Sequence, residues 1–389
     1  MEKRPLLILF ATLFCVMTGF GIIIPVLPYI ATQLPGTDAR TVGFLLASYS
    51  LMNVLCAPFW GRLSDRVGRK PVLMTGILGL AASFLLFGLS HDLTLYFVSR
   101  LVGGAFGAAA LPTAMAYAGD ITTSESRAKA LGMLGAGLGL GMVVGPAIGG
   151  ASGHLGFSVP FYVATGLCVA TALFVAIALP KGTPSSEGRV GMVEALKLTG
   201  KTLWPFYLLT FIQMLAFTSM EATFVLFAKA PPFNLTVMQT GLMFMAMGLV
   251  SAGFQGGGVA KLIKRFGETT ITRAGCGVLA LGFLFTPLCT NWIELLGAFC
   301  FFGIGSAMLR TSLSTGVSRG AAAGQGTAMG MMQSCDSLAR VFGPAVGGML
   351  FVIRPALTYE AGVAVMLVAA ILSFATMRPE ALEAATTAA

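Results

Sequence analysis

Twelve apolar runs of about 20 residues each dominate the chain. A helix needs roughly 20 apolar residues to cross the hydrocarbon core of a bilayer, where an unpaired backbone group finds no partner. The runs therefore predict an all-α membrane protein with twelve transmembrane helices. They span approximately residues 6–30, 41–60, 71–90, 94–118, 129–153, 157–179, 204–228, 238–260, 270–290, 292–317, 325–352 and 357–377.

The composition excludes several other classes of protein. Of 389 residues, 10% are charged and 56% are hydrophobic, and the mean hydropathy is +0.86. Soluble domains average about 25% charged residues, and disordered chains are rich in charge. The net charge of +9 comes from short basic clusters between apolar runs, so we expect a lipid bilayer around the protein and no nucleic-acid partner.

No sequence motif indicates an enzyme. The seven cysteines and two histidines show no CxxC spacing and no Cys/His cluster, so we expect neither a metal site nor a cofactor. The sequence also lacks a nucleophile elbow and a G-x-x-x-x-G-K-[ST] loop, which leaves no basis for ATP hydrolysis. No sizeable soluble segment favours a receptor.

The basic residues predict the orientation in the membrane. If the N-terminus is cytoplasmic, 18 of the 24 Lys and Arg residues fall in cytoplasmic segments and three in outer segments (Arg40, Lys229 and Arg354). Cytoplasmic loops carry an excess of Lys and Arg, so both termini are expected in the cytoplasm. We expect the cytoplasmic (inner) membrane as the location.

The two halves of the chain repeat each other at an offset of 198 residues. GPAIGG at 145–150 recurs as GPAVGG at 343–348, and ALGM at 130–133 recurs as AMGM at 328–331. RVGR at 66–69 has a weaker counterpart, RFGE at 265–268. We predict a six-helix bundle over 1–179, a cytoplasmic linker over 180–203 and a second bundle over 204–389, with a substrate site between the halves.

The loop after the second run carries a motif of glycines and charges. It reads GRLSDRVGRKP from Gly61, where Gly68 permits a tight turn and Asp65 can pair with an arginine. We expect Asp65, Arg69 and Asp120 to form a charge latch within a gating loop that also includes Arg66. The alternative is a solvated basic loop that only sets topology.

These motifs resemble those of the major facilitator superfamily. The loop from Gly61 resembles its signature loop, and Gly141, Gly145, Pro146, Gly149 and Gly150 in the fifth run resemble the antiporter motif of its twelve-span drug/proton antiporters. Arg100 is similar to the arginine of an R-x-x-x-G segment in the fourth span. The resemblance implies export rather than import, although small residues also serve generic helix packing.

The resemblance departs from tetracycline exporters and from quinolone exporters at specific positions. The acid of tetracycline exporters in the first span is replaced by Val16, which argues against magnesium-tetracycline as substrate. Glu221 and Arg310 are similar to an acid and an arginine of quinolone and multidrug exporters. Their second acid, three residues before the arginine, is replaced by Ala307.

Five charged residues fall inside the predicted spans and away from their edges, where charges are costly and usually functional. They are Arg100, Glu221, Arg310, Asp336 and Arg340. Asp336 and Arg310 have similar predicted depths, and Arg340 lies one turn beyond Asp336, so Asp336 is either an ion-pair partner or a proton carrier. Glu221 has no counter-charge nearby on its own span. It is a candidate for proton coupling, or else it bonds a neighbouring helix.

Candidate cavity residues follow from helical spacing. Gln213, Phe217, Glu221 and Phe224 share one stripe, which places aromatic rings and an amide beside an acid. Tyr49 and Asn53 in the second span and Met332 in the eleventh are further candidates, although such residues also pack against neighbouring helices.

The sequence thus favours a monomeric secondary exporter that moves protons inward and amphipathic organic compounds outward. A proton-coupled importer of a small nutrient, or a dedicated exporter of one endogenous metabolite, is the alternative. The sequence does not distinguish a promiscuous drug exporter from a dedicated one.

Overall fold

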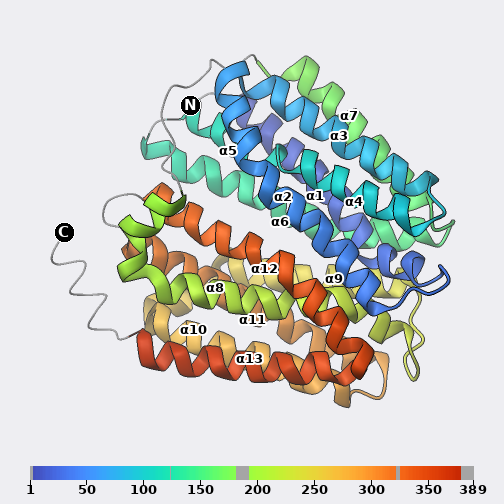
Figure 1. Ribbon diagram of the computed structural model, residues 1–389. Helices are drawn as coiled ribbons and strands as arrows, with labels where there is room; N and C mark the ends of the chain where they lie inside the picture. The colour runs from blue at the N-terminus through green and yellow to red at the C-terminus, as the bar shows by residue number, and fades with distance from the viewer. Residues whose placement is uncertain (1–2, 123, 181–191, 321–324, 378–389) are drawn as a thin grey trace. The chain divides into compact units, whose positions relative to one another are not determined.

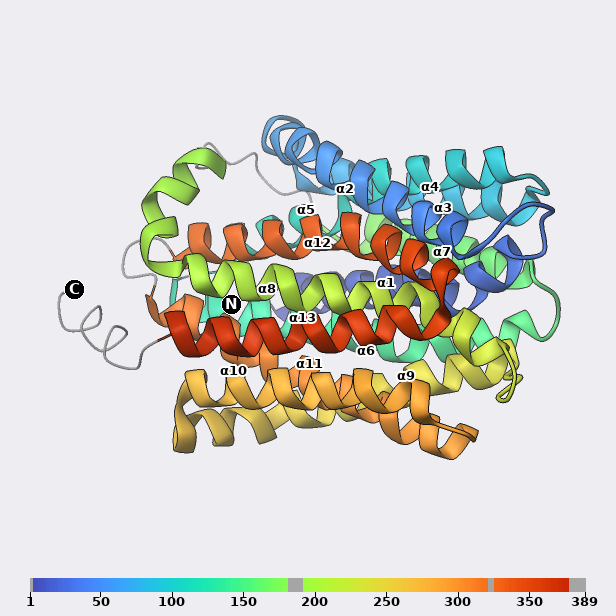
Figure 2. The same cartoon turned by 60° about the horizontal axis from the view of Figure 1, so that its bottom comes forward.

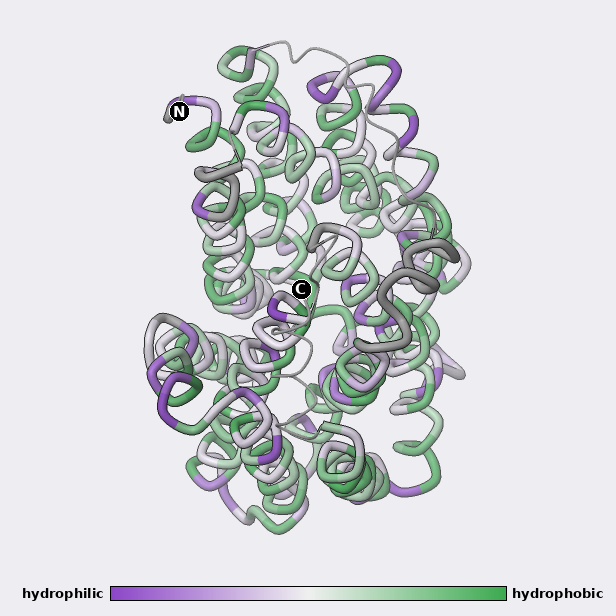
Figure 3. The backbone as a smooth tube through the Cα atoms, turned by 90° about the vertical axis from the view of Figure 1, so that its left-hand side faces the viewer, coloured by the Kyte–Doolittle hydropathy of each residue, from purple (hydrophilic) through white to green (hydrophobic). Residues whose placement is uncertain are grey.

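The computed structural model describes residues 3–122, 124–180, 192–320 and 325–377, and every regular element within them is a helix. Eleven helical segments among these residues are long and apolar enough to cross a bilayer. Figure 3 shows hydrophobic residues along most of the backbone, with hydrophilic residues in short segments. The fold is therefore the all-helical membrane architecture expected from the apolar runs.

The described helices fall into two compact units, each of which has its own core. Unit 1 contains Leu235–Met245 and seven helices: α1 (Lys3–Ala31), α2 (Ala39–Val67), α3 (Arg69–Leu89), α4 (Leu93–Gly107), α5 (Ala110–Asp120), α6 (Ser124–Gly153) and α7 (Val159–Ala178). Unit 2 contains α8 (Met192–Lys229), α9 (Val237–Gly253) from Ala246 onward, η1 (Phe254–Gly258), α10 (Val259–Phe285), η2 (Thr286–Leu288), α11 (Trp292–Gly320), α12 (Gln325–Ile353) and α13 (Pro355–Thr376).

The units differ in one segment from the predicted bundles. Leu235–Met245 belongs to unit 1, although the sequence places it in the second half. Of the predicted linker at 180–203, residues 181–191 lie outside the described residues, and α8 begins at Met192. The bundle limits at 179 and 204 stay predictions.

The predicted span at 238–260 differs from the other predicted spans. It corresponds to α9, an apolar helix of 17 residues, which is followed directly by η1 and α10. Gly267 inside α10 has φ 79° and ψ 158°, so the helical path breaks there, in the predicted loop between the eighth and ninth spans. The count of twelve spans stays a prediction.

Each unit contains a pair of long helices packed along each other. α1 packs along α6 in unit 1, and α8 packs along α12 in unit 2, as Figures 1 and 2 show for the second pair. α8 also contacts α11 and α13. The second pair, together with α11, positions the residues that line the cavity described below.

Cations complete the last helix of each unit. Lys70 Nζ donates to the carbonyl oxygens of Ala176 and Leu179, both at 2.7 Å. Arg273 Nη2 donates to the carbonyls of Ser373 and Met377 at 3.3 and 3.1 Å. The last carbonyls of a helix have no partner within it and carry partial negative charge, so a cation there stabilises the end of α7 and of α13.

Candidate functional site

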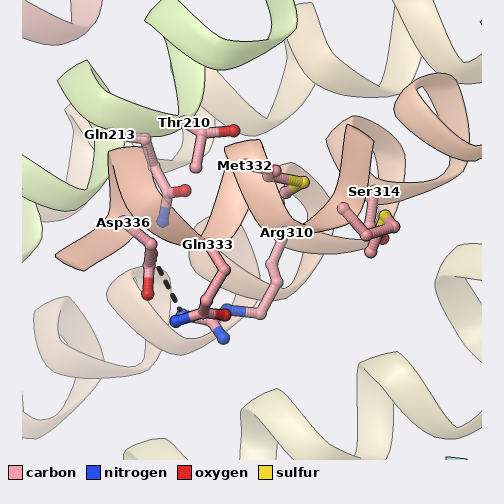
Figure 4. A pocket seen from close by; sticks show the side chains of 8 residues that line it. Thr210, Gln213, Arg310, Ser314, Met332, Gln333 and Asp336 are labelled. Carbon is pink, nitrogen blue, oxygen red and sulfur yellow. Dashed lines mark ion pairs between the residues drawn. The ribbon is translucent and has the colours of Figure 1, made fainter. Parts of the chain in front are cut away.

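A cavity of about 130 Å³ lies within unit 2, between α8, α11 and α12. Its lining is Thr210, Gln213, Arg310, Ser314, Met329, Met332, Gln333 and Asp336. Figure 4 shows these side chains, with Arg310 extending toward Asp336. Among them are the predicted Gln213, Met332, Arg310 and Asp336. The lining therefore combines flexible apolar methionines with amides, hydroxyls and an ion pair.

Asp336 is the acid of this cavity, and it is buried with an exposed fraction of 8%. Its two carboxylate oxygens face different cations: Oδ1 lies 3.7 Å from Arg310 Nη2, and Oδ2 lies 3.5 Å from Arg340 Nε. The structure thus contains the ion pair expected from matched depth and the one expected from helical spacing. Both separations exceed the 2.7–2.9 Å or so of a tight charge-assisted hydrogen bond.

Gln213 adds a polar group that has spare hydrogen-bonding capacity. Its side chain is buried, with 3% exposed, and its Nε2 has no hydrogen-bond partner among the described residues. A buried unpaired donor is costly, typically about 1–3 kcal/mol, unless a ligand or water satisfies it. Gln213 can therefore donate to an acceptor that enters the cavity.

Glu221 lies two turns beyond Gln213 on α8 and is half-buried. It forms no hydrogen bond and no ion pair with any residue that the structure describes. This agrees with the absence of a counter-charge on its own helix. A carboxyl group in this setting can hold or release a proton without breaking a bond to a protein partner.

The remaining predicted cavity residues lie away from the lining of this cavity. Phe224 is fully buried and stacks on Phe299 with ring centroids 3.9 Å apart, so it packs the core of unit 2. Phe217 is half-buried. In unit 1, Tyr49 lies 5.4 Å from the ring of Phe20, and Asn53 is half-buried.

Arg100 is almost fully buried in unit 1, with 1% exposed. Its Nε and Nη2 atoms have no hydrogen-bond partner among the described residues. Aromatic rings take the place of an acid: the guanidinium carbon lies 5.1 Å from the centroid of Phe87 and 5.7 Å from that of Tyr49. Such cation–π contacts offset part of the cost of burying the charge.

The gating-loop charges form a connected cluster in unit 1. Arg69 is buried; it donates from Nε to Asp120 Oδ2 at 2.8 Å and from Nη1 to Ser64 Oγ at 2.8 Å, and it also pairs with Asp65. Gly68 has φ 96°, which allows the turn between α2 and α3. Gly61 is buried in α2, and Arg66 is exposed.

The glycines of the fifth predicted span allow close contact between α6 and its neighbours. A methyl group at Gly145 would lie 2.7 Å from both Gly21 Cα and the Thr18 carbonyl oxygen, and one at Gly141 would lie 2.5 Å from the Phe14 carbonyl oxygen. Gly149 meets the carbonyl of Ile22 on α1, while Gly150 meets Met238 in the 235–245 segment of unit 1. Pro146 lies inside the helix.

Sequence reasoning missed an ion pair in unit 2. Arg319 Nη1 donates to both carboxylate oxygens of Glu268, at 3.1 and 2.9 Å. The signal was the weak repeat RFGE, in which Glu268 stands where the first half has Arg69. It also missed Thr210, Ser314, Met329 and Gln333, of which the last two share a face of α12 with Met332 and Asp336.

Comparisons with known proteins identify the family of the chain. The profile of the Major Facilitator Superfamily matches residues 9–344. The chain is 31% identical over 360 residues to Multidrug resistance protein 1 of Bacillus subtilis (strain 168), which covers 90% of this chain and 91% of that protein. It is 32% identical over 365 residues to Tetracycline resistance protein, class D, of Salmonella ordonez, with 90% of each covered.

Solved structures share the fold. The human organic anion transporter MFSD10 (TETRAN) superposes with a TM-score of 0.70 at 22% identity, over 96% of this chain and 99% of that one. The nucleoside transporter NupG gives a TM-score of 0.76 at 14% identity, over 97% and 98%. Together, the apolar helices and these matches define a multi-pass membrane transporter of small molecules. The chain belongs to the Major Facilitator Superfamily.

Proposed function

We propose that the protein is a proton-coupled antiporter that exports amphipathic organic compounds across the cytoplasmic membrane. It acts as a monomer with twelve spans and both termini in the cytoplasm. It has no enzymatic activity and uses no cofactor, metal or nucleic acid. Proton influx supplies the free energy for efflux.

The direction of transport rests on the relatives. Proteins named for multidrug and tetracycline resistance match about 90% of the chain at 28–32% identity. Gly145 and Gly149, which pack against α1, belong to the segment that resembles the antiporter motif of drug/proton antiporters. The 18-to-3 distribution of basic residues supports the cytoplasmic termini.

The observation that carries proton coupling is the contrast between the two acids of unit 2. Glu221 is half-buried and forms no hydrogen bond or ion pair with a described residue, whereas Asp336 faces the cavity between two arginines. One carboxyl is thus available to a proton, and the other is available to a substrate. Methionines in the lining adapt to substrates of different shape.

Transport in proteoliposomes tests the proposal. Purified full-length protein is reconstituted, and a panel of cationic dyes and quinolones is offered with a pH gradient of either sign, with and without a proton uncoupler. We expect accumulation of substrate on the acidic side and its loss with the uncoupler. Equal accumulation without a gradient would contradict proton coupling, and transport of one metabolite alone would indicate a dedicated exporter.

Two carboxylate variants identify the coupling group. Glu221→Gln mimics the protonated acid and should abolish gradient-driven accumulation. Glu294→Gln makes the same chemical change at an exposed residue at the start of α11 and should transport like the wild type. If Glu221→Gln accumulates substrate at the wild-type rate, Glu221 is not the coupling residue.

A further inference from the structure

Two intramembrane acids of unit 2, Asp336 and Glu221, lie on the paired helices α12 and α8. Asp336 forms ion pairs with Arg340 at 3.5 Å and with Arg310 at 3.7 Å. Glu221 has no ion pair with a described residue and lies on α8, which packs along α12. Arg340 therefore pairs with one acid and lies on the helix that packs against the helix of the other.

The contacts between α8 and α12 place Arg340 at a level between the acids. Thr218 Oγ1 lies 3.5 Å from the carbonyl oxygen of Ala339, and Ser219 Oγ donates to the carbonyl of Gly343 at 2.7 Å. The paired residues rise together, so the helices run parallel. At 1.5 Å per residue, Arg340 lies about 6 Å along the axis beyond Asp336 and, by these two contacts, about 3–8 Å short of Glu221.

Arg340 has room to exchange partners. Its side chain is 34% exposed, and its contact with Asp336 is long for a charge-assisted hydrogen bond. Asp336 keeps a second cation, Arg310, if Arg340 leaves. Because α12 packs along α8, the long and flexible Arg340 side chain needs to change only its direction along the helix axis to leave Asp336 for Glu221.

Other titratable groups near α8 come from three neighbouring helices. α12 contributes Cys335 in addition to Asp336 and Arg340, and α11 contributes Arg310. α13 contributes Tyr359, which is fully buried with its ring 4.9 Å from that of Phe227. On α8 itself, Lys229 lies two turns beyond Glu221. Among these groups, the arginines are the cations close to Asp336.

We propose that Arg340 is a shared cation that couples substrate binding to proton release. While Glu221 carries a proton, Arg340 pairs with Asp336. When a cationic substrate enters the cavity and binds Asp336, Arg340 moves to Glu221 and favours its ionised form, so the proton leaves to solvent. This inference rests on the proposed function and names lipophilic cations as its substrates.

The exchange balances in charge. Before binding, the protonated Glu221, ionised Asp336 and two arginines give a net charge of +1. Afterwards, the substrate cation, two carboxylates and two arginines also give +1. Because the site keeps the same charge, binding one cation and releasing one proton adds no uncompensated charge to the membrane interior.

Proton release on binding tests this role directly. Full-length protein in detergent and weak buffer is mixed with tetraphenylphosphonium at a series of pH values, and a pH indicator reports protons released while calorimetry reports binding. The variants are Arg340→Gln, Arg340→Lys and Glu221→Gln. Arg354→Gln is the matched control, since Arg354 is exposed and pairs with Glu360 at the start of α13.

We expect the wild type and Arg354→Gln to release about one proton per cation bound, and Glu221→Gln to bind without release. In Arg340→Gln the midpoint of release should move upward by about one pH unit or more, because the ionised carboxyl has lost its cation. Arg340→Lys should restore part of the shift. Arg340→Met replaces Arg340→Gln if that variant does not fold.

Two different failures can be separated. If the release curves of Arg340→Gln and the wild type coincide, Arg340 does not couple the acids, while proton antiport through Glu221 stands. If the wild type releases no proton, or Glu221→Gln releases as many as the wild type, the proposed function fails at this site and the inference fails with it.

Discussion

The helix pair α1/α6 in unit 1 and the pair α8/α12 in unit 2 make the same contact with different residues. Gly145 on α6 meets Gly21 of α1, and Gly343, at the equivalent position on α12, meets Thr218 of α8. Gly347 meets the carbonyl of Ser219, as Gly149 meets that of Ile22. The repeat at an offset of 198 residues therefore preserves the helix contact.

The charges do not follow this repeat. The unit 1 positions equivalent to Glu221, Asp336 and Arg340 are Ile23, Leu138 and Met142. Unit 1 instead buries Arg100 within the predicted fourth span, and the equivalent position in unit 2 is Ala298. The comparison teaches that packing is common to both units, whereas Glu221 and Asp336, the acids within the spans for which we propose coupling, have apolar residues at the equivalent positions of unit 1.

At the ends of the helices, the repeat keeps an ion pair but reverses its polarity. Arg69 and Asp120 are 51 residues apart, as are Glu268 and Arg319. Lys264, four residues before Glu268, stands where unit 1 has Asp65 four residues before Arg69. An ion pair thus joins α3 to α5 in unit 1 and α10 to α11 in unit 2, with the acid and the base exchanged between the two units.

The largest expected effect concerns the shared glycine contact. Gly149→Ala and Gly347→Ala should each destabilise the protein by about 1–3 kcal/mol, because the added methyl group meets a backbone carbonyl that cannot move freely. Thermal unfolding of purified protein in detergent measures the loss. Gly139→Ala and Gly330→Ala, which have open space on the same two helices, are the controls.

These controls should be neutral or slightly stabilising, because alanine favours a helix over glycine by about 0.5–1 kcal/mol. A loss of stability in Gly149→Ala without a loss in Gly347→Ala would contradict the equivalence of the two helix pairs.

The intramembrane charges should respond in opposite directions in the two units. Arg100→Met should raise the free energy of unfolding by about 2 kcal/mol, because it removes a buried cation that no acid compensates among the described residues. Asp336→Asn should lower the free energy of unfolding by about 1 kcal/mol, because the substitution leaves Arg310 and Arg340 without their acid. The unfolding temperatures of the two variants report both changes. Shifts of the same sign in both variants would contradict the contrast between the units.

The smallest expected effect concerns the reversed ion pair. Arg319→Glu should cost about 0.5–1 kcal/mol through repulsion from Glu268, because the Arg319 side chain is 57% exposed and solvent screens the charge. The double variant with Glu268→Arg should recover the loss, since it restores the polarity of unit 1. Unfolding temperatures of the two single variants and the double variant measure the coupling, and additive losses would show that the pair is not needed.

The sequence predicts the helices well because the backbone N–H and C=O groups of each apolar run can hydrogen-bond to one another only within a helix. It also identifies Asp336 with both arginines, since helical spacing and depth determine which charges can meet. It could not assign Phe224 to the packed core, because a helical stripe does not show which neighbour covers it. Sequence analysis did not identify the pair of Glu268 and Arg319, because the weak motif RFGE has an acid where the signature loop of the first half has an arginine.

The central claim is that an acid of unit 2 couples protons to substrate, and one comparison tests it most directly. Glu221→Gln is measured in proteoliposomes for two reactions: exchange of labelled for unlabelled tetraphenylphosphonium, and accumulation driven by a pH gradient. Exchange needs no net proton movement, so it should persist, while accumulation should disappear. Retention of gradient-driven accumulation, or equal loss of both reactions in a folded protein that still binds the cation, would contradict the account.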